Sequence, residues 1–183
     1  MRQAILALFT TLLYCSTAMA DTLIHAGRLI DGDSDRAKMA QTIRVVDGLI
    51  ASIEDGYSTP ANGDAVVNLR ESTVLPGLMD THVHLTGQYS ASSNLNRFVL
   101  NEADYAYDAA KYARRTLHAG FTVVRNLGDA FNVTIALRKA IAAGDVPGPM
   151  ILTAGSSLAS TGGHGDRTNG WAAHFDADPG PKQ

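Results

Sequence analysis

The chain has 183 residues, of which 45% are hydrophobic and 18% are charged. This globular composition provides enough apolar side chains for the core of one ordinary domain or two small ones. The formal net charge is −3 at pH 7 and there is no basic stripe, so composition argues against nucleic acid or an anionic membrane surface as partners.

The first twenty residues have the pattern of a cleaved signal peptide. Arg2 supplies a short positive region, residues 4–14 form an apolar run too short to span a bilayer as a stable helix, and residues 18–20 are Ala-Met-Ala, a cleavage pattern. We therefore expect an exported protein, periplasmic or secreted, with no stable membrane anchor. A hydrophobic first strand and an uncleaved anchor are the alternatives. Cys15, the only cysteine, would leave with the leader, so we expect no disulfide.

Residues 21–72 predict a small β-sheet domain. Its expected strands are short apolar stretches at residues 22–26, 28–32, 42–46, 49–53 and 65–69. Asp47-Gly48 separates two of them and predicts a hairpin with a type I′ turn. Asp31, Asp33 and Asp35 resemble a calcium loop, but no glutamate follows at the required spacing, so they favour a solvated turn.

A ten-residue stretch, residues 76–85, carries the strongest indication of chemistry. It follows the extended lead-in at residues 73–75 and reads PGLMDTHVHL. Because side chains alternate along a strand, Asp80, His82 and His84 are predicted to share one face. Two imidazoles one pleat apart can bind one ion at about 2.0–2.1 Å per nitrogen, the distance that zinc prefers. A bare His-X-His pair is also common as a surface or core pair, so these residues alone do not make a site.

From residue 73 onward the pattern predicts alternating strands and helices. A helix is expected to begin near Asn101 and to end at Gly120, followed by a strand over residues 121–126. A second helix over residues 132–143 ends at a glycine, and residues 149–154 form the next strand. Elements of this order and length predict a parallel sheet with right-handed crossovers.

The stretch at residues 76–84 resembles the first barrel strand of the amidohydrolase superfamily. Three later phrases, residues 118–125, 140–149 and 161–166, resemble its branch of imidazolonepropionase-like enzymes and secreted Xaa-Pro dipeptidases. The resemblance implies an α/β fold: an incomplete (β/α)8 TIM-type barrel, with three strands in residues 73–183, preceded by a small β-sandwich segment in residues 21–72. Asn126 departs from the pattern, since relatives commonly carry aspartate there.

The strand positions and the resemblance together predict roles for individual residues. His82 and His84 would be metal ligands, and Asp80 would orient a histidine rather than bind the ion. His164, in a glycine-rich segment after the third strand, and Arg125, at the end of the second, would contact substrate. The alternatives are a solvent-facing loop histidine and an arginine with a structural partner.

The function expected from the resemblance is hydrolysis of a C–N amide bond in a small substrate, a dipeptide or an N-acyl amino acid. One or two divalent ions, with zinc as the first candidate, would activate the water. In the resembled family the remaining ligands and the proton-relaying aspartate lie on later strands, so we expect an N-terminal fragment without its own catalytic residue. A cyclic-amide hydrolase or deaminase, and an inactive truncated metal-binding protein, stay open as alternatives. A homo-oligomer of the full-length enzyme also stays open.

Overall fold

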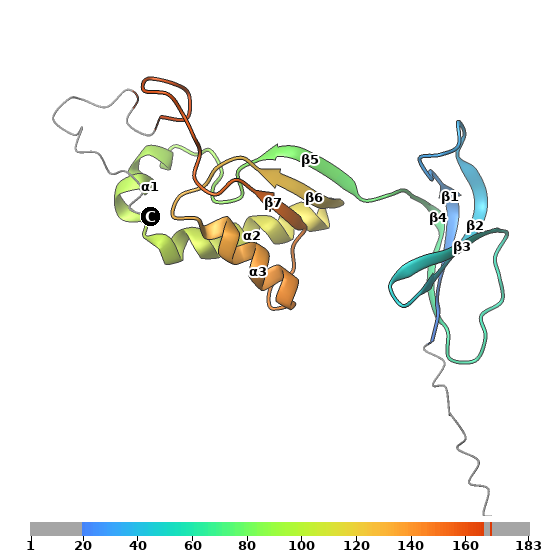
Figure 1. Cartoon of the computed structure of the whole chain (residues 1–183). Coiled ribbons are helices and arrows are strands. Elements are labelled where there is room, and N and C mark those ends of the chain that lie inside the picture. The colour runs from blue at the N-terminus through green and yellow to red at the C-terminus, as the bar shows by residue number, and fades with distance from the viewer. Residues whose placement is uncertain (1–19, 167–168, 170–183) are drawn as a thin grey trace, which may run out of the picture. The chain divides into compact units, whose positions relative to one another are not determined.

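The computed structural model describes residues 20–166 and residue 169, and it divides into two units between Pro76 and Gly77 (Figure 1). Each unit is described by itself below. The signal-peptide prediction falls on residues 1–20 and lies almost wholly outside the described residues. No helix in the described part of the chain is long and apolar enough to cross a membrane.

The first unit contains one four-stranded sheet. Its strands lie in the order β3-β2-β1-β4, with bounds β1 Thr22–Leu29, β2 Lys38–Val46, β3 Leu49–Asp55 and β4 Ala65–Val74. β2 pairs antiparallel with both β1 and β3, whereas β1 and β4 are parallel. Asp47 (φ 50°) and Gly48 (φ 77°) join β2 to β3, which confirms the predicted type I′ hairpin. The second layer of a sandwich is not among the described residues, so that part of the expectation stays a prediction.

Two strand boundaries in this unit were predicted wrongly. Gly27 does not divide the first two apolar stretches; it lies inside β1, where the register against β4 shifts between Ala26 and Arg28. A Cβ atom at Gly27 would lie 1.8 Å from the carbonyl oxygen of Arg70, so the glycine permits a close approach of two backbones rather than a turn. β4 also continues to Val74, so most of the predicted lead-in belongs to this sheet and not to the strand after Pro76.

The acidic turn is explained by its hydrogen bonds. Asp31 Oδ1 accepts the backbone N–H groups of Asp33 and Ser34, at 3.1 and 2.9 Å, and Lys38 Nζ lies 2.8 Å from Asp31 Oδ2. The ammonium of Lys38 and the two N–H donors hold the pKa of Asp31 well below its usual value. This carboxylate therefore organises a turn, as expected.

The second unit is an α/β layer with a parallel three-stranded sheet in the order β5-β6-β7. The strands are β5 Leu78–Val83, β6 Phe121–Asn126 and β7 Met150–Thr153, and the helices are α1 Ser93–Val99, α2 Glu102–His118 and α3 Val133–Ala143. The predicted strands, the two longer helices and the parallel pairing are confirmed. α1 was missed because seven residues carry too little periodicity to distinguish a helix from a loop.

α2 begins at the predicted cap. The Asn101 side chain accepts the backbone N–H groups of Ala103 and Asp104, and Asp104 Oδ2 accepts the N–H of Asn101 at 2.9 Å. This reciprocal capping box fixes the start of the helix. α2 and α3 lie on one face of the sheet (Figure 1), where they bury Val124 and Ile151. On β7, Met150 and Leu152 alternate with Ile151 and stay exposed, so no described segment of this unit covers the apolar side chains on that face of the strand.

β5 and β6 leave strict register near the carboxyl end of β5. Asp80 pairs with Val124 and Val83 pairs with Asn126, so Thr81 and His82 together face Arg125. Two residues opposite one is the count of a β-bulge, a feature that re-aims side chains near functional sites. The bulge lies at the strand end where parallel α/β folds place their chemistry.

Candidate active site

The two histidines of the motif lie side by side at the end of β5. Their ring centroids are 5.5 Å apart and the ring planes meet at 64°, an edge arrangement. Both side chains are exposed, and the imidazole of His82 makes no hydrogen bond to any described residue. The structure therefore brings together the pair that the motif singles out.

His84 is held in a defined orientation. Its Nδ1 lies 2.9 Å from the carbonyl oxygen of Gly128, in the loop after β6. A carbonyl oxygen only accepts hydrogen bonds, so Nδ1 carries the proton and the lone pair of the neutral ring resides on Nε2. An imidazole anchored in this way through one nitrogen presents the other as a ligand.

Asp80 contacts the backbone rather than an imidazole. Its Oδ1 accepts the backbone N–H of His82 at 3.0 Å, an interaction across two residues that stabilises the bulge. Asp80 therefore orients His82 through the main chain, and no ring nitrogen of His82 or His84 is bonded to it.

Arg125 also supports the bulge. Its Nε donates to the carbonyl oxygen of Thr81 at 2.8 Å, across from the position where the ladder between β5 and β6 is interrupted. The side chain is exposed. This contact is the structural alternative considered for Arg125; its proposed contact with substrate stays a prediction.

His164 is not brought to the histidine pair by any contact in the described residues. It is exposed in the loop after β7, and its side chain bonds to no described residue. Gly162 N–H and Asp166 Oδ2, 2.7 Å apart, close the turn around it. The role of His164 in substrate binding likewise stays a prediction.

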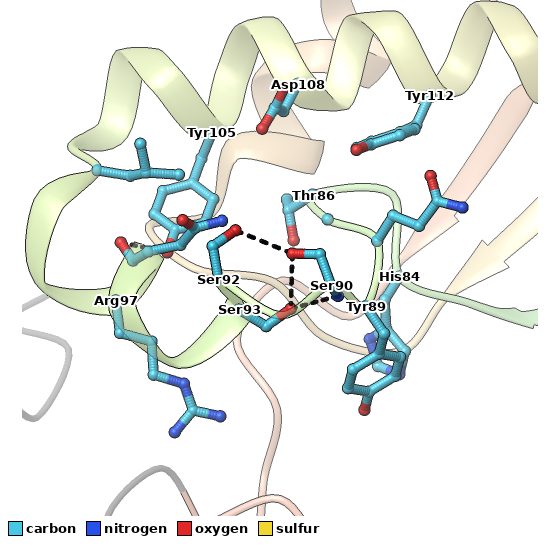
Figure 2. Close-up of a pocket in the computed structure, with 14 residues that line it drawn as sticks. His84, Thr86, Tyr89, Ser90, Ser92, Ser93, Arg97, Tyr105, Asp108 and Tyr112 are labelled. Atoms are coloured by element: carbon cyan, nitrogen blue, oxygen red, sulfur yellow. Dashed lines mark hydrogen bonds between the residues drawn. The ribbon is translucent and has the colours of Figure 1, made fainter.

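A cavity of about 540 Å³ borders His84. Figure 2 shows its wall, in which the loop after β5 and α1 face side chains of α2. Its lining is polar and aromatic and includes Tyr89, Ser93, Arg97, Tyr105, Asp108 and Tyr112. Arg97 is exposed and makes no ion pair in the described part of the chain, whereas Asp108 pairs with Lys111. The cavity can therefore offer a cation and several hydroxyl groups to a small polar ligand.

Sequence reasoning missed these lining residues. Tyr89, Ser93 and Arg97 lie in the segment between β5 and α2, which has neither a motif nor a clear period. Tyr105, Asp108 and Tyr112 lie on α2 itself. The signal that was present is positional, since the loop after a barrel strand borders the active face in folds of this kind.

A model of the Amidohydrolase family matches residues 73–179. The chain belongs to the amidohydrolase family.

Relatives of this amidohydrolase act on different compounds. The ochratoxinase of Aspergillus niger is 30% identical over 151 residues, which cover 79% of this chain and 30% of the relative. The enamidase of Eubacterium barkeri is 43% identical over 72 residues, covering 38% of this chain and 19% of the enzyme.

Solved structures give the same assignment. A Xaa-Pro dipeptidase crystallised with methionine in its active site matches with a TM-score of 0.78 and 41% identity, over 85% of this chain and 38% of that one. A prolidase complexed with N-methylphosphonate-L-proline matches with a TM-score of 0.68 and 26% identity, over 80% and 35%. The amidohydrolase chain thus spans between 19% and 38% of the length of these proteins, and the α/β fold with parallel strands is that of the two solved structures.

The donor set of this amidohydrolase fits a divalent ion in part. His82 and His84 offer two neutral nitrogen ligands on adjacent rings, and the second is anchored through Gly128. Among the described residues no group of three or more His, Cys, Asp or Glu side chains could hold a metal ion. Zinc sites need three or four ligands, so the pair fits as one side of a site whose remaining ligands come from elsewhere.

Proposed function

We propose that this chain is the N-terminal, metal-holding part of an amidohydrolase that cleaves a C–N bond in a small amide. The observation that carries the proposal is the adjacent pair of His82 and His84 with Nε2 of His84 left free, at the carboxyl end of a parallel strand. The family match and the hydrolase relatives support the reaction class.

The proposed protein is a complete (β/α)8 barrel preceded by a β-sandwich. The exposed apolar side chains of Met150 and Leu152, which no described segment covers, support a barrel, since both would lie inside it. Later strands of the complete barrel would supply the other metal ligands and the proton-relaying carboxylate. A leader over residues 1–20 would export the enzyme to the periplasm or the medium.

The ion is proposed to be zinc, with one or two per active site. When bound, it would lower the pKa of a water ligand towards about 7 and polarise the substrate carbonyl. His82 and His84 would hold it, while Asp80 and Arg125 keep the bulge that carries His82 in place. The cavity beside His84 would take the substrate, with Arg97 offering a counter-charge to a carboxylate and with Arg125 and His164 as further contacts.

Dipeptides and N-acyl amino acids are the proposed substrates, because the Xaa-Pro dipeptidase is 41% identical over 85% of this chain. A deaminase or cyclic-amide hydrolase is the second candidate, since a 5'-deoxyadenosine deaminase of Methanosarcina acetivorans is 36% identical over 67 residues. One fold supports both reactions, so only assay separates them.

The test is turnover by the purified complete protein against dipeptides, N-acyl amino acids, cyclic amides and adenosine derivatives. Release of an amino acid that stops with chelator and returns with zinc supports the proposal. Ammonia release from the nucleosides would favour the deaminase, and chelator-insensitive turnover would refute the metal mechanism. Binding of metal without turnover of any compound would favour an inactive metal-binding protein.

A further inference from the structure

Asn126 is a fully buried polar side chain next to the histidine pair. It is the last residue of β6, with 0% of its surface exposed, and it pairs in register with Val83. A buried amide is costly unless its hydrogen-bonding groups are satisfied. Its partners therefore indicate what it is for.

The Asn126 side chain has three partners among the described residues: Leu85 N–H, the Gly128 carbonyl oxygen and, at 3.5 Å, Thr134 Oγ1. The first two adjoin His84. Asn126 Oδ1 accepts the backbone N–H of Leu85, the next residue, at 2.8 Å. Asn126 Nδ2 donates to the carbonyl oxygen of Gly128 at 3.2 Å. The orientation of the amide follows from chemistry, because an N–H group needs an acceptor and a carbonyl needs a donor.

The Gly128 carbonyl is the same atom that accepts Nδ1–H of His84. A carbonyl oxygen has two lone pairs, so the amide of Asn126 and the imidazole of His84 occupy both. Leu127 N–H further donates to the Val83 carbonyl at 3.1 Å. The main chain is thus fixed immediately before and after His84, and the acceptor of its ring is fixed as well.

We propose that Asn126 is a positioning residue that sets the ring orientation and the Nδ1–H tautomer of His84 through the Gly128 carbonyl. Resting on the proposed function, this means that Asn126 presents Nε2 of His84 to the ion without touching it. An ionised aspartate could accept from Leu85 N–H but could not donate to Gly128, so the amide of this chain is matched to both partners.

The test compares Asn126→Ala and Asn126→Asp with a control, Thr153→Val, in the complete protein. Thr153 Oγ1 accepts from Gly155 N–H and bonds to Thr134, so the control disrupts the same polar network without touching Gly128 or His84. Asn126→Asp keeps the shape of the side chain, and circular dichroism of each variant shows whether it is folded. Long-range ¹H–¹⁵N NMR of the metal-free protein, at a pH where imidazole is neutral, reports the His84 tautomer.

In the wild type and in Thr153→Val, His84 is expected to be the single Nδ1–H form, and both Asn126 variants are expected to give a mixture of tautomers. Co²⁺ titration followed by visible absorption should give an affinity roughly 10- to 100-fold lower for Asn126→Ala, the loss typical of partners that orient a ligand. An unchanged tautomer in both Asn126 variants overturns the proposal, whatever the affinity. If the wild type binds no Co²⁺ but the His84 tautomer still responds to the Asn126 substitutions, the proposed function is overturned and the positioning role of Asn126 remains.

Discussion

Substitution of Gly77, next to the start of β5, is predicted to destabilise the fold because of one side chain on β6. A Cβ atom at Gly77 would lie 2.1 Å from Oγ1, 2.4 Å from Cγ2 and 2.7 Å from Cβ of Thr122. Rotation about χ1 of Thr122 could move the first two atoms but not the third. The strands would therefore have to separate until that distance reaches at least 3.4 Å, where ordinary contacts begin.

We expect Gly77→Ala to lower the free energy of unfolding by about 1–3 kcal/mol, the usual cost of overpacking. In a Thr122→Gly background the obstacle is gone, so the same substitution should cost at least about 1 kcal/mol less, a coupling of the size found for residues in contact. The measurement is urea unfolding followed by circular dichroism for the four proteins of the cycle.

Gly87→Ala is the matched control. Gly87 lies in the same unit with no atom within 4 Å of an added Cβ, so its substitution should change the free energy of unfolding by no more than about 0.5 kcal/mol. The reasoning is refuted if Gly77→Ala costs no more than this control, or if its cost is the same with and without Thr122.

Three further predictions follow from the site and its neighbours. Gly128→Ala would place Cβ 1.7 Å from Ser157 Oγ at a φ of 156°, so it should displace the carbonyl that holds His84 and weaken Co²⁺ binding roughly 10- to 100-fold. Wild-type affinity in Gly128→Ala would contradict this. Arg125→Met should weaken Co²⁺ binding as well, because it removes the donor to the Thr81 carbonyl in the bulge. An unchanged Co²⁺ titration would show that Arg125 does not support the metal-binding histidines. The pKa of Asp31 is lowered in the folded protein, so its charge stabilises the fold at any pH above the ordinary pKa of 3.8, and this contribution is lost as the pH falls through the lower pKa of the folded state. Asp31→Asn should therefore reduce the urea midpoint at pH 7 and have no effect in acid. An effect that is independent of pH would argue against this explanation.

Much of the second unit could be predicted because its signals are local. The capping box at Asn101 and the β-branched run of β6 each act within a few residues, and so does the Asp47-Gly48 turn in the first unit. These elements appear where the sequence placed them. The wrong strand boundary at Gly27 has a different cause. A glycine is needed there because the Arg70 carbonyl lies close to it, on a neighbouring strand that is distant in the sequence.

The site could be predicted only in part. The motif indicates His82 and His84, but strict alternation along β5 does not anticipate the bulge at Thr81 and His82. The anchoring of His84 depends on Gly128 and on the buried Asn126, which come from the next strand and its loop. Such contacts depend on the register between two strands, which neither strand encodes alone.

The most direct test of the account is the metal content of the complete protein by elemental analysis after exhaustive dialysis. One or two equivalents of a divalent transition metal, zinc first, are expected in the wild type and in His118→Ala, whose exposed histidine lies at the end of α2. His82→Ala combined with His84→Ala should lose it. A wild type without stoichiometric metal, or a double variant that keeps it in full, would contradict the account.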